Sequence, residues 1–180
     1  MNIYEQLATF NIIETERLLL RPLSMADAAD MFSYASQADN LVYVFPKHDN
    51  IAQTRLIIAN MFMKAPLGKW AIEHKTDHQM IGTITFVKLD EKNRSAEIGY
   101  VLNQRYWGQG LMTEVVKTIA EFSLETFGLT HIDIVVDSDN LGSIKVAEKA
   151  QFHSVETYKA LSPYTKVLKV FKRYRKGNHE

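Results

Sequence analysis

Two glycines separated by one residue, Gly108 and Gly110, give the clearest signal of a ligand-binding site in this sequence. They end the segment Arg105-Tyr106-Trp107-Gly108-Gln109-Gly110, which follows an apolar run typical of a strand and precedes an amphipathic helical pattern. Glycine lets a backbone approach a ligand closely, and the first turn of a helix offers N–H groups without intrahelical partners at the positive end of the helix dipole. Residues 96–116 therefore predict a binding site for an anion.

A dinucleotide-binding interpretation takes the two glycines as a Rossmann fingerprint and Asp137, at the end of the next expected strand, as the ribose-binding acid. The third glycine of that pattern is Thr113 here, and polar residues separate the strand from the glycines. The chain beyond is also too short for a full doubly wound sheet. A P-loop is excluded because no Gly-Lys-Ser/Thr follows the glycines.

A third interpretation rests on the pattern Arg/Gln-x-x-Gly-x-Gly/Ala, which is complete from Arg105 to Gly110. This pattern resembles the pyrophosphate-binding signature of the GNAT acyltransferase superfamily. Within it, residues 93–112 and Asn140-x-x-Ser143, leading into Val146-Ala147-Glu148-Lys149, are similar to the RimJ and RimL branch of ribosomal-protein alanine N-acetyltransferases. The resemblance covers nearly the whole chain.

The resemblance implies acetyl-CoA as the co-substrate. Backbone N–H groups would hold its pyrophosphate, and they belong to Arg105, Tyr106, Trp107, Gly108, Gln109, Gly110, Leu111 and Met112. The pantetheine arm would lie along Gly99, Tyr100 and Val101, although packing alone could also require a glycine at Gly99. Asn140 and Ser143 are the other cofactor-binding candidates, and Asn140 is equally suited to be a plain helix N-cap.

The implied chemistry is attack of an amine on a thioester, which requires a base for the amine and a proton for the departing thiolate. Glu97 is the candidate base, acting through a water, because it is a carboxylate in an otherwise apolar strand where burial would bring its proton affinity towards working pH. The alternative places Glu97 on the open face of a half-covered strand. Ser143 is the candidate acid, with bulk water as the alternative, because the position where many GNAT enzymes carry a tyrosine is Ala147. Ser143 could also serve only as a residue of the first helical turn.

Hydrophobic periodicity predicts the elements that must position these residues. Strands are expected at residues 14–23, 70–74, 80–89, 93–102, 130–137, 152–160 and 166–174. Helices are expected at 25–36, 51–64, 111–127 and 140–150, with Ser24 as an N-cap and Gly128 as a C-cap. The order predicts an α/β (mixed α+β) fold in one domain, residues 1–180. The resemblance adds the GNAT acyl-CoA N-acyltransferase fold, a mixed, mostly antiparallel sheet with helices on both faces.

Composition limits the other function classes. The chain is 46% hydrophobic and carries 21 basic and 21 acidic residues, so no net field favours nucleic acid or an anionic membrane. It lacks cysteine, an apolar run of about 20 residues and a signal-peptide pattern, which together suit a cytoplasmic protein. The pair His74-x-x-x-His78 crosses an expected turn, so no metal site is expected. The basic residues 172–176 are expected to be a solvated end.

These observations favour a cytoplasmic N-acetyltransferase that moves acetyl from acetyl-CoA to a primary amine by direct attack in a ternary complex. The acceptor could be a protein N-terminal amine, as of a ribosomal protein, or a small-molecule amine. A non-catalytic CoA-binding regulatory module is the alternative from another class. The sequence is compatible with a monomer or a homodimer, and it leaves open whether a loop near Tyr43 and Pro46 acts as a lid.

Overall fold

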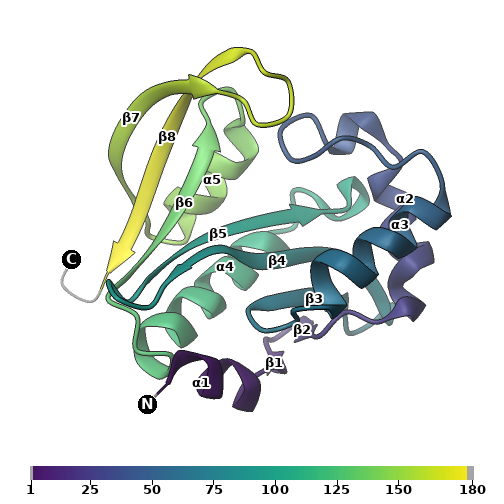
Figure 1. Cartoon of the computed structure of the whole chain (residues 1–180), viewed down its shortest axis with the longest axis horizontal. Coiled ribbons are helices and arrows are strands. Elements are labelled where there is room, and N and C mark those ends of the chain that lie inside the picture. Colours follow the sequence, from purple (N-terminus) through teal and green to yellow (C-terminus); the bar gives the residue numbers. More distant parts are fainter. Residues whose placement is uncertain (1, 178–180) are drawn as a thin grey trace. The chain divides into compact units, whose positions relative to one another are not determined.

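The computed structural model describes residues 2–177, which form two compact units. The first unit contains the chain up to Thr85 together with Tyr100–Leu111, and the second contains Phe86–Gly99 together with the chain from Met112 onwards. Two long strands, β4 (Gln79–Asp90) and β5 (Ser95–Leu102), each contribute residues to both units. Figure 1 shows the course of the chain and the labels used below.

The first unit is built on antiparallel strands with two helices packed against each other (Figure 1). Its remaining elements are α1 (Ile3–Thr9), β1 (Ile13–Glu14), β2 (Leu18–Arg21), α2 (Ala28–Ala35), α3 (Ile51–Ile57) and β3 (Lys69–His74). Strands β1, β2, β3 and β4 pair in this order, with β5 beside β4. A core cluster that includes Met31, Tyr34, Ile58 and Val101 joins α2 and the helical segment after α3 to β5.

The predicted N-cap at Ser24 is present, and it caps the 3-10 turn Met25–Asp27 that leads into α2. Ser24 Oγ accepts a hydrogen bond from the Ala26 N–H, and the Asp27 carboxylate accepts one from the Ser24 N–H at 2.7 Å, which forms a capping box. Helix α3 continues as a wider π-helical segment, Ile58–Met63, in which the Lys64 N–H donates to the Ala59 carbonyl. The predicted helices at 25–36 and 51–64 are confirmed.

The N-terminal region differs from the prediction. The expected strand at 14–23 is instead a hairpin of β1 and β2, because the chain turns where the Thr15 N–H donates to the Leu18 carbonyl at 2.9 Å. Helix α1 was not predicted at all. This helix has 7 residues, and only Gln6 and Leu7 among them are buried, so it offers a short window for hydrophobic periodicity.

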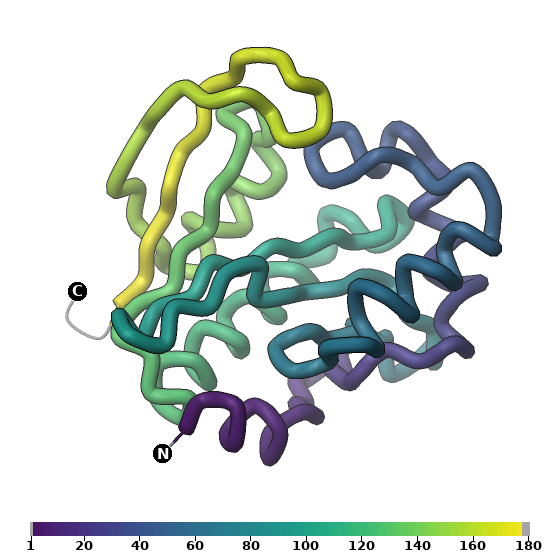
Figure 2. Tube along the Cα trace, viewed as in Figure 1, coloured from purple at the N-terminus to yellow at the C-terminus, as the bar shows by residue number. Residues whose placement is uncertain are grey.

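The second unit combines parallel and antiparallel strand pairing. Its further elements are α4 (Leu111–Glu121, from Met112 in this unit), β6 (His131–Asp137), α5 (Leu141–Lys149), β7 (His153–Leu161) and β8 (Leu168–Gly177). Strand β6 is parallel to β5 and antiparallel to β8, and β8 pairs in turn with β7. Figure 2 shows these strands side by side. The prediction of a mixed, mostly antiparallel sheet is confirmed.

The helical region that begins with α4 ends where the sequence predicted. The C-terminal region, in contrast, differs from its prediction. After a π-helical segment, Phe122–Thr126, the chain leaves the helix at Gly128 with φ of 70°. The expected solvated basic end at 172–176 is wrong, because these residues belong to β8 and Tyr174 among them is buried. Within residues 2–177, no helix has the length and apolar character needed to cross a membrane.

Candidate active site

The glycine loop connects β5 to α4 and is ordered by hydrogen bonds to its own backbone. A 3-10 turn, Gln104–Tyr106, begins where the Asn103 side chain accepts a hydrogen bond from the Arg105 N–H at 3.1 Å. The Trp107 indole Nε1–H then donates to the Leu102 carbonyl at 2.9 Å, although nearly half of this side chain is exposed. The loop is therefore held in a defined shape while its outer side remains accessible.

Gly108 and Gly110 both adopt the left-handed backbone conformation, with φ of 74° and 77°. Side chains other than glycine rarely adopt this conformation. Among the described residues, no atom lies within 4 Å of the position that a Cβ on Gly108 would take, and only Arg17 Nη2, at 3.7 Å, approaches that of Gly110. Both glycines are exposed, so backbone geometry requires them and the space beside them is open.

This open space lies at the start of α4, whose first N–H groups have no intrahelical partners. Exposed N–H groups, the positive end of a helix dipole and room beside the backbone are the features that bind a phosphate. The loop therefore fits the pyrophosphate of acetyl-CoA. The sequence predicted these residues from their local pattern.

Arg17 is a second cation at this loop, and the sequence analysis missed it. It precedes β2, and its Nη1 donates to the Gln109 carbonyl oxygen at 2.9 Å across 92 residues of sequence. No local pattern links two residues so far apart. The Tyr106 hydroxyl donates to Asp77 Oδ2 at 2.7 Å, and burial together with this carboxylate raises the pKa of Tyr106 to about 12.

The expected pantetheine contacts on β5 fall in different environments. Val101 is buried in the core of the first unit and Tyr100 is half-buried there. Gly99 belongs to the second unit, where an added Cβ would lie 3.0 Å from Val87 Cγ1. This contact favours the packing explanation for Gly99 that the sequence left open.

Glu97 does not lie in the apolar surroundings that the sequence analysis expected. Its Oε2 accepts hydrogen bonds from Lys88 Nζ at 3.2 Å and from Arg173 Nη1 at 3.3 Å. The side chain is 15% exposed, so the carboxylate is partly covered and paired with two cations. The expectation of an apolar environment is wrong, because β8 brings an arginine beside β5 and β6.

Asp133 lies at the centre of the same ionic network. Cross-strand register places it between Glu97 on β5 and Arg175 on β8. Arg175 Nε and Arg173 Nη1 donate to its carboxylate at 2.7 and 3.0 Å. Burial alone would raise the pKa of Asp133, but the hydrogen bonds and charges of Arg175 and Arg173 outweigh it and hold this pKa below its ordinary value.

Asn140 and Ser143 lie together at the start of α5 in the second unit. Asn140 Oδ1 accepts a hydrogen bond from the Ser143 N–H at 3.1 Å, which makes Asn140 the N-cap. Ser143 is half-buried, and Ala147, one turn later, is fully buried. The capping alternative for Asn140 is therefore confirmed, and it leaves a cofactor contact open to test.

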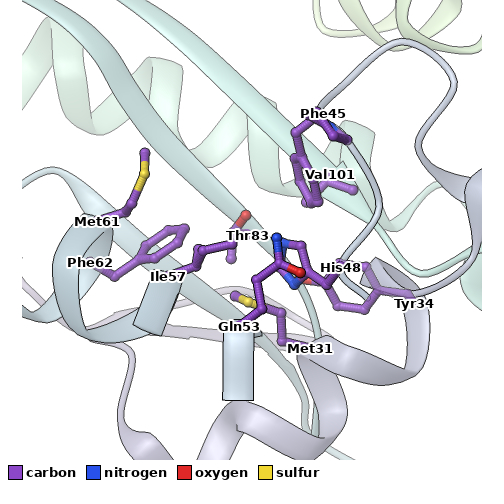
Figure 3. A pocket seen from close by; sticks show the side chains of 11 residues that line it. Met31, Tyr34, Phe45, His48, Gln53, Ile57, Met61, Phe62, Thr83 and Val101 are labelled. Carbon is purple, nitrogen blue, oxygen red and sulfur yellow. The ribbon is translucent and has the colours of Figure 1, made fainter. Parts of the chain in front are cut away.

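A cavity of about 220 Å³ lies in the first unit, between α2, the connection at residues 41–50, α3 with its π-helical continuation, and strands β4 and β5 (Figure 3). Phe45 and His48 stack on this connection, with their ring centroids 5.4 Å apart. Val101 on β5 lines the cavity from the other side. The connection that contains Tyr43 and Pro46 thus forms one wall of this cavity.

Comparison with known proteins assigns the class. The family model described as an acetyltransferase (GNAT) domain matches residues 17–153, more than half of the chain, and the chain belongs to this family. It is a GNAT N-acetyltransferase with the fold that the sequence resemblance implied.

Three similar proteins illustrate the family. The uncharacterized N-acetyltransferase YoaA of Bacillus subtilis is 31% identical over 147 residues, 79% of this chain and 83% of that protein. The ribosomal-protein-serine acetyltransferase of Escherichia coli is 29% identical over 76 residues, 42% of each chain. The structure of RimL, a ribosomal L7/L12 alpha-N-protein acetyltransferase in complex with coenzyme A, has a TM-score of 0.81 at 18% identity and covers 92% of this chain and 97% of that one.

Proposed function

We propose that this enzyme transfers acetyl from acetyl-CoA to a primary amine by direct attack in a ternary complex. The observation that carries the proposal is the glycine loop, in which two left-handed, exposed glycines open a helix beside unfilled space. In the proposal, the backbone of residues 105–112 holds the pyrophosphate. The pantetheine arm contacts Gly99, Tyr100 and Val101, and Asn140 and Ser143 make the remaining cofactor contacts.

A thermal-shift experiment tests this proposal. Acetyl-CoA, CoA and NADPH are added separately, because a ligand present at a hundred times its dissociation constant stabilises the folded chain by about 2.7 kcal/mol. We expect acetyl-CoA and CoA to raise the midpoint of thermal unfolding and NADPH to leave it unchanged. A shift with NADPH alone would support the dinucleotide interpretation instead. Binding of CoA without acetyl transfer to any amine would indicate a regulatory module.

The proposed base is Glu97, and Ser143 is the proposed acid for the departing thiolate. Lys88 Nζ at 3.2 Å and Arg173 Nη1 at 3.3 Å hold the Glu97 carboxylate in place on β5.

Glu97→Gln is expected to lower kcat by about 100-fold, the lower end of what general acid–base groups contribute, while the midpoint shift with acetyl-CoA stays intact. Steady-state thiol release and the thermal shift measure the two effects. Glu156→Gln is the matched control, because Glu156 also pairs with Arg173, at 3.2 Å, but is half exposed and has no proposed role. Equal rates in both variants would make Glu97 only a structural partner of Arg173.

The acceptor is a protein N-terminal amine or a small-molecule amine. A protein N-terminal amine is supported by the name of RimL, which is 18% identical to this chain. It is also supported by the name of the Escherichia coli relative, which matches 42% of this chain. A cytoplasmic location and a monomeric or homodimeric state stay predictions. An acceptor screen that contains both peptides and small amines separates the two acceptor classes.

A further inference from the structure

The cavity of the first unit has a wall that is almost entirely apolar. Met31 of α2, Phe45 of the connection, Ile57 of α3 and Phe62 of its continuation contribute side chains to it (Figure 3). Phe62 is only partly buried, and Met61 beside it is 60% exposed, so this edge of the cavity faces solvent. A ligand could therefore enter without unfolding the wall.

The lining carries no carboxylate and no permanent cation. Its polar members are Tyr34, His48, Gln53 and Thr83. His48 Nδ1 lies 2.9 Å from Thr54 Oγ1, and burial lowers the pKa of His48, so its imidazole is neutral at pH 7. A second ammonium group on the ligand would lose its hydration here without gaining a charged partner.

Val101 connects this cavity to the proposed function. It is one of the β5 residues proposed to contact the pantetheine arm, and its side chain also lines the cavity. A group held in the cavity would thus lie next to the strand segment along which the thioester is expected. This step rests on the proposed function.

The volume limits the size of the occupant. A cavity of about 150 Å³ lined by leucine, isoleucine and phenylalanine binds benzene, whereas sites for drug-sized ligands measure about 300 to 1,000 Å³. The volume here, about 220 Å³, lies between these values. It fits one aromatic ring or one short branched alkyl group, and not an extended chain.

We infer that the acceptor is an amine that carries a single uncharged apolar group of about this size, which the cavity binds. Diamines and polyamines are poor acceptors on this inference. Acceptors with only a short polar substituent lack the group that fills the cavity.

The test compares four primary amines under saturating acetyl-CoA: 2-phenylethylamine, 3-methylbutylamine, ethanolamine and 1,4-diaminobutane. We expect kcat/KM for the first two to exceed that for the last two by at least tenfold, the lower end of the discrimination that even one buried methylene gives. Calorimetry without acetyl-CoA provides a readout independent of turnover, in which 2-phenylethylamine binds and ethanolamine does not. A preference for 1,4-diaminobutane would overturn the inference.

Ile57→Trp fills the cavity and is expected to lower kcat/KM for 2-phenylethylamine at least tenfold and to remove its calorimetric signal. Leu56→Trp is the matched control, because Leu56 is adjacent on α3 but 63% exposed and outside the lining. Equal effects of the two variants would refute the role of the cavity. If Ile57→Trp does not fold, Phe62→Ala enlarges the cavity instead and should shift the preference towards larger aryl amines; an unchanged preference would refute the inference.

The outcomes for the inference and for the proposed function are distinct. Failure of acetyl-CoA to raise the midpoint overturns the proposed function, whatever the amines do. A normal acetyl-CoA shift combined with equal rates for apolar and polar amines overturns only the inference.

Discussion

Gly110→Val is expected to remove the stabilisation that acetyl-CoA gives the wild-type chain, from about 2.7 kcal/mol at a hundred times the dissociation constant to nearly zero. The residue has φ of 77°, which a β-branched side chain does not tolerate, and the added methyl groups would occupy the open space beside the loop. Acetyl transfer should fall with binding. Thermal shift and isothermal calorimetry with acetyl-CoA measure the loss.

Gly128→Ala is the control that separates this effect from backbone strain. Gly128 has φ of 70° at the end of the α4 helical region and lies outside the proposed cofactor loop. The substitution should cost about 1 to 2 kcal/mol of stability but leave the midpoint shift with acetyl-CoA unchanged. Wild-type affinity for CoA in Gly110→Val would refute the site.

Asp133→Asn is expected to lower the free energy of unfolding by about 2 to 3 kcal/mol at pH 7. The carboxylate is 8% exposed and receives hydrogen bonds from both Arg173 and Arg175, which would lose their buried negative partner. This loss of unfolding free energy is smaller than that expected for a fully buried ion pair, because both arginines are partly exposed to solvent. Thermal denaturation should show a midpoint lower by roughly 4 to 12 °C for a chain of this size.

The effect of Asp133 depends on pH with a definite sign. Its pKa is lower in the folded chain than in the unfolded chain, so its contribution is complete above the unfolded pKa of about 3.9 and is lost as pH falls through the folded value. The difference between wild type and Asp133→Asn should therefore shrink below about pH 4. Urea denaturation at pH 7 and pH 3 tests this. A constant difference would contradict it.

Asp139→Asn serves as the control for Asp133. Asp139 is 69% exposed and lies 3.6 Å from Lys169, and an exposed pair of this kind contributes little. Its substitution should change stability by less than about 0.5 kcal/mol at either pH. A loss as large as that of Asp133→Asn would show that charge number, and not the buried network, determines the effect.

The sequence predicted the features that depend on neighbouring residues. The capping of the 3-10 turn Met25–Asp27 by Ser24, the N-cap at Asn140 and the left-handed turn at Gly128 each follow from residue types a few positions apart. The glycine loop belongs to this group, because Gly108 and Gly110 need only their own backbone and the helix that follows.

Features that depend on strand register could not be predicted in this way. The neighbours of Glu97 along its own strand are apolar, so the sequence predicted an apolar environment for it. The cations that pair with Glu97 come from two other strands, β4 and β8. Asp133 meets its two arginines through pairing across 40 and 42 residues of sequence. Side-chain contacts of this kind require the sheet order, which local patterns do not specify.

The hydrogen bond from Arg17 to the Gln109 carbonyl affects the next peptide N–H as well. A trans peptide group is planar, so its C=O and N–H point in opposite directions. Directing the Gln109 oxygen towards Arg17 therefore directs the Gly110 N–H away from that guanidinium. The orientation is set when the chain folds, so a bound pyrophosphate would not have to order this peptide and would bind more tightly for that reason. Preorganisation from the turn before β2 would thus contribute to cofactor affinity through a residue that need not touch the cofactor.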